Sequence, residues 1–182
     1  MRILACFGNL STVLMVFTAI TSLNIGLVTL GNISDFDTNR AFVEHVLSMD
    51  TTFGSPNTKE RAITDQRLIT AAYLMIISWE FLTTVVLTVA FLCWLRAIVV
   101  KWGAAVARQL SICGWLMQII LFGGGFIAIG GEWFQMWQSS KWNGTQPALQ
   151  NFLIASIGLI LAHLSGPESL TLSRMGRSNS ER

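Results

Sequence analysis

LITAAYLMIISWEFLTTVVLTVAFLCWL, from Leu68 to Leu95, is the stretch that decides the fold, because it contains a single charged residue, Glu80. A helix needs about 20 predominantly apolar residues to cross the hydrocarbon core of a bilayer. The stretch is longer than this, so it predicts a helix that crosses a membrane.

Three further stretches have the same character. Ile3–Leu30 and Leu110–Gly131 carry no charge, and Trp142–Pro167 carries none if His163 is neutral. The last stretch is the weakest, because Gly166-Pro167 ends the helix and leaves roughly 18 residues, just short of a typical span. We still predict that it crosses the membrane, since a re-entrant segment would need buried partners for its backbone groups.

Together the four stretches predict an all-α fold: a polytopic membrane protein built as a four-transmembrane-helix bundle. The membrane domain covers residues 1–165, and we expect residues 166–182 to form a polar, disordered cytoplasmic tail. A long outer loop, residues 31–67, follows the first span. The predicted spans are about 4–30, 69–95, 109–132 and 147–164.

The composition agrees with this class. Charged residues make up 12% of the chain, the apolar fraction is 52% and the net charge is +2, whereas about a quarter of the residues in a soluble domain are charged. The small net charge argues against a nucleic-acid partner. The cysteines all lie in apolar stretches, and we find no catalytic or metal-binding motif. We therefore expect a protein that is not an enzyme and has no metal site and no cofactor.

Basic residues predict the orientation, because they gather on the cytoplasmic side of membrane proteins. Four crossings put both termini on one side, with seven basic and two acidic residues, against five basic and seven acidic residues on the other. We expect both termini in the cytoplasm. Tryptophans near the predicted boundaries fit an aromatic belt, for example Trp94 and Trp115 on the inner side.

The outer loop is too long for a plain connection. Asp37 or Thr38 can cap a helix there, and four apolar residues then share one face: Phe42, Val43, Val46 and Leu47. This pattern predicts a short amphipathic helix. The loop could pack over the mouth of the bundle, or it could act as a lid or a docking surface.

Glu80 is the strongest pointer to a functional site, because an ionisable group in mid-membrane is costly unless it is paired, wet or protonated. Tyr73, Thr84 and Thr88 lie roughly on its helix face. We expect this stripe to meet the third span near Gln118. Gln118, Gly125 and Glu132 follow one another at intervals of seven residues and should share a helix face. Glu80 and Gln118 are thus candidates for a polar pair or a relay. Glu80 could be a buried structural carboxyl, a contact to a partner or ligand, or a proton or ion relay.

A second candidate site is the outer mouth of the bundle, where carboxylates and tryptophans should gather. Such a cluster could bind a cation, a sugar or a loop of a partner, or it could form a hydrogen-bonded cap. Its candidate members are Asp37, Asn39, His45, Asp50, Glu132, Trp133, Trp137 and Trp142.

Two strings carry a resemblance to a known family. Phe36–Phe53, FDTNRAFVEHVLSMDTTF, and Ile129–Asn143, IGGEWFQMWQSSKWN, resemble a family of small predicted bacterial integral membrane proteins of unknown function. The likeness extends over nearly the whole chain up to about Leu164. It implies a four-helix protein of the bacterial plasma (inner) membrane, and it brings no reaction, cofactor or catalytic residue.

Two function classes follow. The first is a non-catalytic accessory or stabilising subunit of a larger bacterial membrane complex, respiratory or transport. Its partners would be the lipid bilayer and other membrane protein subunits. The alternative is a small membrane transporter, channel or sensor that uses the intramembrane carboxylate of Glu80. Small size, the missing chemical motif and the glycine-lined helix faces favour the accessory subunit.

Overall fold

The computed structural model describes residues 9–100 and 103–164, and these residues form helices without any strand. Within them, four helices are long and apolar enough to cross a membrane. The all-α fold with four apolar helices is therefore confirmed. The predicted tail, residues 166–182, lies outside the described residues. The four are α2 (Leu10–Ser34), α4 (Gln66–Val100), α5 (Ala104–Gln118) continued by η2 (Ile119–Trp133), and α6 (Thr145–Leu164).

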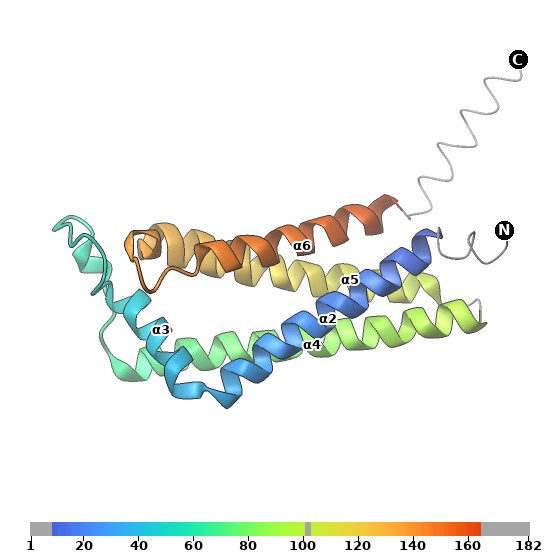
Figure 1. Cartoon of the computed structure of the whole chain (residues 1–182), viewed down its shortest axis with the longest axis horizontal. Helices are drawn as coiled ribbons and strands as arrows, with labels where there is room; N and C mark the ends of the chain where they lie inside the picture. The colour runs from blue at the N-terminus through green and yellow to red at the C-terminus, as the bar shows by residue number, and fades with distance from the viewer. Residues whose placement is uncertain (1–8, 101–102, 165–182) are drawn as a thin grey trace, which may run out of the picture.

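The long helices lie side by side, and the short elements gather at one end of the bundle (Figure 1). These are α3 (Phe36–Ser48), η1 (Lys59–Arg61) and η3 (Met136–Gln138). We call this end the α3 end. The beginning of α2 and the end of α6 lie at the opposite end, as an even number of crossings requires.

The outward faces of the helices are apolar, as a bilayer demands. Leu23, Met75 and Ile160 are among the large apolar side chains that stay exposed. In water such a surface would cause aggregation, but in lipid it is the solvated surface. The interior is narrow and contains many small residues. In lipid no hydrophobic effect drives helices together, and small residues let them pack closely.

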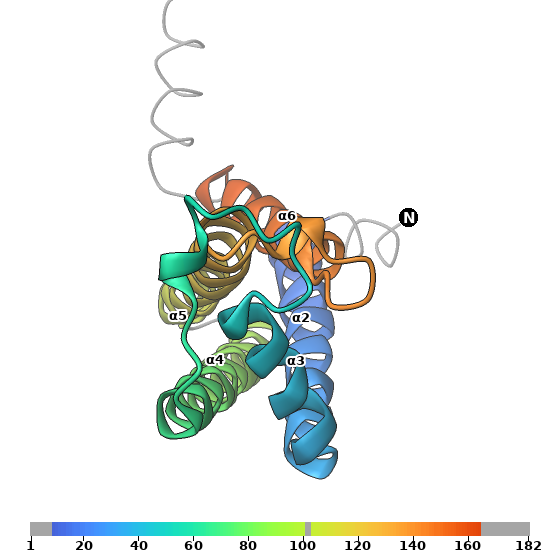
Figure 2. The same cartoon turned by 90° about the vertical axis from the view of Figure 1, so that its left-hand side faces the viewer.

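The amphipathic helix is present as α3, with Val43 and Val46 buried. It begins at Phe36, only Asp35 separates it from the end of α2, and this N-cap residue makes no side-chain hydrogen bond. The expected caps at Asp37 and Thr38 are therefore wrong. Figure 2 shows α3 lying across the end of the bundle, between α2 and α4. It packs on α4 in a cluster around Val43. In this cluster the rings of Phe36 and Tyr73 meet edge to face, with their centroids 4.9 Å apart.

The third span changes from an α-helix to a wider π-helix at Ile119. At its end the Phe134 N–H donates to the Ile129 carbonyl, five residues earlier, at 3.0 Å. This wider helix changes the rotation per residue, so residues seven apart no longer share a face. The expected seam through Gln118, Gly125 and Glu132 is wrong, because Gln118 is buried and Glu132 is exposed.

Two glycines fix the closest helix contacts. A Cβ atom on Gly158 would lie 2.6 Å from the Trp115 ring, and one on Gly114 would lie 2.4 Å from Leu87. Real Cβ atoms do not approach so closely, and the rigid ring of Trp115 can move aside less easily than the flexible end of Leu87. Gly158 therefore sets the distance between α6 and α5.

We predict that Gly158→Ala lowers the free energy of unfolding by about 1–3 kcal/mol, the usual cost of overpacking a core. Thermal unfolding in mild detergent, followed by circular dichroism, measures this loss. Gly124→Ala is the matched control, because a Cβ atom there has no neighbour within 4 Å. Equal stability of the two variants would contradict the assignment of Gly158 as a spacer.

Candidate functional site

Glu80 lies on the face of α4 that packs against α2. Its side chain is 1% exposed, and its Oε2 accepts a hydrogen bond from Asn32 Nδ2 at 2.7 Å. The backbone carbonyl of Asn32 accepts from the Tyr73 hydroxyl, also at 2.7 Å. Asn32 therefore joins α2 to α4 through both its side chain and its backbone.

The polar contacts continue along the same interface. Thr84 Oγ1 lies 3.4 Å from Thr29 Oγ1, and Thr88 Oγ1 lies 2.9 Å from Ser22 Oγ. We call this ladder, from Tyr73 and Asn32 to Thr88 and Ser22, the α2–α4 polar seam. Its residues on α4 are those that the sequence placed on one stripe. Their partners on α2 were missed, although Ser22 and Thr29 are seven residues apart and hence share a helix face.

Gln118 does not meet Glu80, so the expected pair is wrong. Trp79, the residue before Glu80, faces the third span instead, and its Nε1 donates to the Met117 carbonyl at 2.9 Å. Neighbouring residues point about 100° apart around a helix, so the residue that faces the third span is Trp79 and not Glu80. The Gln118 amide is 1% exposed and has no hydrogen-bond partner among the described residues.

Two tryptophans expected in an aromatic belt lie inside the bundle instead. Trp115 is fully buried, and its Nε1 donates to Thr21 Oγ1 at 3.2 Å. Trp94 donates to Ser111 Oγ at 3.0 Å, and Ser111 also lies 3.1 Å from Thr18 Oγ1. Each indole N–H thus has a partner that the surrounding hydrocarbon could not supply.

The expected outer-mouth cluster divides into separate groups. One group joins three of its members at the end of α3. His45 Nδ1 lies 2.7 Å from Asp50 Oδ2, and the His45 ring stacks on Trp142 with centroids 4.4 Å apart. Lys141 Nζ lies 4.8 Å from the centroid of the same indole. This group ties α3 to the segment before α6.

The other expected members lie elsewhere. The Arg61 guanidinium carbon lies 4.4 Å from the centroid of the Trp133 ring. Trp137 and Phe53 meet edge to face, with their ring centroids 5.9 Å apart. Asn39 donates to the Asp35 carbonyl at the corner between α2 and α3. Asp37 and Glu132 are exposed. Among the described residues, these two form no hydrogen bond or ion pair with the rest of the set.

Contacts between two loops hold the α3 end together. Thr51 Oγ1 donates to Ser139 Oγ at 2.9 Å, and the backbone N–H of Phe53 donates to Gln138 Oε1 at 2.9 Å. Thr58 Oγ1 donates to Gln135 Oε1 at 3.1 Å. Sequence reasoning missed these residues, because neutral polar side chains in loops carry no periodic signal.

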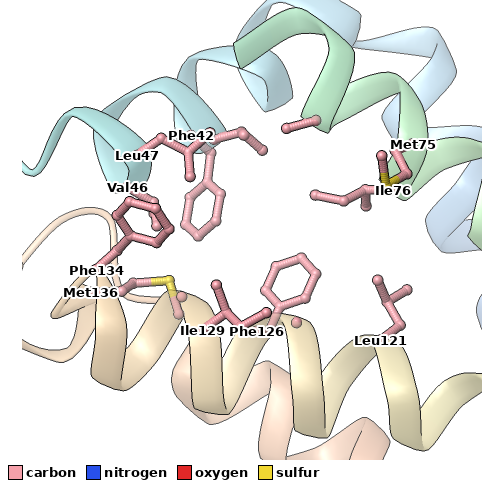
Figure 3. A pocket seen from close by; sticks show the side chains of 14 residues that line it. Phe42, Val46, Leu47, Met75, Ile76, Leu121, Phe126, Ile129, Phe134 and Met136 are labelled. Carbon is pink, nitrogen blue, oxygen red and sulfur yellow. The ribbon is translucent and has the colours of Figure 1, made fainter. Parts of the chain in front are cut away.

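Two of the hollows on the described part of the bundle adjoin the elements described above. The α2–α4 groove runs over the outer edge of the polar seam. It is lined by Ala19, Ser22, Leu23, Gly26, Leu27, Thr84, Thr88 and Phe91. The second is an apolar pocket of about 230 Å³ between α3, α4 and η2 (Figure 3). Its lining consists of Phe42, Val43, Val46, Leu47, Ala72, Met75, Ile76, Leu121, Gly125, Phe126, Ile129, Gly130, Phe134 and Met136.

Comparison with known proteins gives one finding. A family model described as "Predicted small integral membrane protein (DUF2165)" matches residues 10–165. No curated protein and no solved structure gives a significant match. The matched range includes the polar seam, the groove, the pocket and the loops of the α3 end.

We predict that Asn32→Leu lowers the free energy of unfolding by about 1–3 kcal/mol, because it leaves a buried carboxyl group without its donor. Thermal unfolding in mild detergent checks this. Glu80→Gln should stay close to the parent protein, since an amide oxygen still accepts from Asn32. Asn57→Leu, at an exposed loop position, is the control. An Asn32→Leu protein as stable as this control would show that the seam does not hold α2 to α4.

Proposed function

The chain belongs to the DUF2165 family of predicted small integral membrane proteins, as its sequence resemblance indicated, and on that premise we propose that it is a non-catalytic accessory or stabilising subunit. It would serve a larger membrane complex of the bacterial plasma membrane, respiratory or transport, by packing against one of the membrane helices of that complex.

The observation that carries this proposal is the α2–α4 groove. Its floor holds small residues, including Ala19, Ser22 and Gly26, while Leu23 and Leu27 are exposed at its edge. Small residues on a lipid-facing surface let the backbone of a second helix approach closely, and hydroxyl groups beside them can bond across the contact. A groove of this kind is therefore suited to a second helix.

The polar seam supports the same proposal in a second way. Glu80 and Asn32 lock α2 to α4, and these two helices form the walls of the groove. The seam would therefore give the groove a fixed shape. A rigid surface loses less conformational entropy when a partner binds.

The alternative is transport or sensing through Glu80. It needs a route by which water, a proton or an ion reaches the carboxylate. Glu80 is almost fully buried and is engaged by Asn32, and the next polar groups on its face, Thr84 and Thr88, donate to backbone carbonyls of their own helix. This arrangement favours a structural carboxyl over a relay.

We predict that Ala19→Leu disrupts the complex, because it fills the groove without touching the seam. The tagged full-length protein is purified from native membranes in a mild detergent, and co-purifying membrane proteins are identified and quantified. Their yield should fall about tenfold, as expected for a loss of ~1.4 kcal/mol of binding free energy. Thermal unfolding of the variant shows whether the bundle is intact.

Ala128→Leu is the matched control, because it makes the same change at an exposed position of η2. It should keep the parent yield. A parent protein that purifies without any stoichiometric partner would refute the accessory-subunit proposal and favour transport or sensing through Glu80.

We also propose that the α3 end faces outward, with both termini in the cytoplasm, because the basic residues of the sequence favour the opposite end. A fluorescent protein that folds only in the cytoplasm, fused to the C-terminus, should be bright. Alkaline phosphatase, which needs the periplasm, should be inactive when fused at the same position. The reverse pattern would mean that the bundle is inverted.

A further inference from the structure

The apolar pocket exists because two helices diverge. Toward the opposite end of the bundle α4 packs closely on α5, but η2 packs mainly against α6. The space between α4 and η2 is covered at the α3 end by α3, whose Phe42, Val46 and Leu47 face into it (Figure 3). The pocket thus has walls from three elements that are far apart in the sequence.

Glycine keeps the pocket open on the η2 side. Gly125 lines the pocket, and a Cβ atom there would meet only Leu121, at 3.8 Å. The space next to Gly125 could therefore hold a larger side chain, yet the chain leaves it unfilled. The hollow that remains has a volume of about 230 Å³.

The pocket opens sideways toward the lipid. Met75 on α4 and Ile129 on η2 both line it, and they are 71% and 55% exposed. A hydrocarbon core of about 30 Å centred on α4 would begin near residue 73. Met75 therefore lies just inside the hydrocarbon, in the leaflet at the α3 end, where acyl chains are the surrounding solvent.

The chemistry of the lining selects an apolar occupant. All fourteen lining residues are apolar or glycine, so water would find no hydrogen-bond partners there. Apolar cavities of about 150 Å³ stay dry and accept molecules such as benzene. The present pocket is larger than that and has lipid at its mouth.

A basic group lies close to the pocket in η1 (Lys59–Arg61), which precedes the apolar length of α4. Arg61 donates from Nη1 to the carbonyl of Trp133 at 3.2 Å, and its guanidinium covers the Trp133 ring at 4.4 Å. Trp133 directly precedes Phe134, which lines the pocket. A guanidinium has five N–H donors, and among the described residues Arg61 forms no ion pair. It is therefore placed to bind a phosphate group.

We propose that the pocket binds one acyl chain of a phospholipid from the leaflet at the α3 end, and that Arg61 binds the phosphate of this lipid. The apolar lining, the sideways opening inside the hydrocarbon and the cation close to the pocket each match one part of such a molecule. The proposal concerns a different face from the α2–α4 groove and does not depend on the proposed function.

The test uses the full chain in vesicles of phosphatidylethanolamine and phosphatidylglycerol that contain a phosphatidylglycerol with a photoreactive diazirine in one acyl chain. After illumination, peptide mass spectrometry locates the attached lipid. We expect stronger labelling at Met75 and Ile129 than at Leu153, an exposed residue of α6 that reports ordinary contact with bulk lipid.

Gly125→Leu fills the pocket, and labelling at Met75 and Ile129 should then fall to the level of Leu153. Gly124→Leu is the matched control, because Gly124 is exposed and a Cβ atom there has no neighbour within 4 Å; its labelling should stay unchanged. Arg61→Gln should weaken labelling about fivefold, the equivalent of ~1 kcal/mol for one basic group near an anionic lipid.

Thermal unfolding shows whether Gly125→Leu is folded, and Ala72→Leu fills the pocket from α4 if it is not. Pocket labelling that never exceeds labelling at Leu153, or that a folded pocket-filling variant leaves unchanged, would overturn the proposal. The proposal would also be overturned if a second copy of the chain or another protein, and not the lipid, were found to occupy the pocket.

Discussion

Hydrocarbon offers no hydrogen-bond partner, and this constraint shapes the rest of the molecule. Polar groups within the spans therefore bond inside the bundle, and the buried amide of Gln118 is the exception among the described residues. Hydroxyl groups meet the constraint locally: Thr18 and Thr29 each donate to the carbonyl four residues earlier. Larger groups meet it across helices, as Asn32 does with Glu80. The polar interior is therefore a set of contacts that fix which helix faces meet.

The polar seam and the two hollows are consequences of one arrangement. α4 takes part in all of these features. One of its faces joins α2 through the polar seam, and another packs on α5. Near α3, α4 diverges from η2. α2 and α4 contact each other through polar groups, and the groove lined by small residues runs along the lipid-facing edge of this contact. α4 and η2 diverge where both are apolar. No polar side chain of the described residues needs to be covered there, and the apolar pocket lies between them. Polar contacts thus hold α2 against α4 beneath the groove, and the divergence of apolar helices leaves the pocket beside η2.

Sequence reasoning recovered the features that depend on length. A run of apolar residues indicates a span, and the four apolar stretches of the sequence are the four long helices of the structure. Sequence reasoning failed where rotation decides the outcome, because Trp79 and not Glu80 faces the third span. The change to a π-helix at Ile119 moved Glu132 to the surface, and no pattern in the sequence announces that change. The burial of Trp115 depends on Gly158 in another helix, which is a pairing that a single sequence does not display.

The unequal lengths of α4 and α6 have a consequence for the membranes that suit this protein. α4 has 35 residues and α6 has 20, which correspond to about 52 Å and about 30 Å along the helix axis. α4 can meet a thicker bilayer by tilting less, whereas the described length of α6 only equals a typical hydrocarbon core of about 30 Å. The shorter helix therefore sets the upper limit of hydrophobic thickness. In a mixed membrane, the protein should partition into the thinner regions.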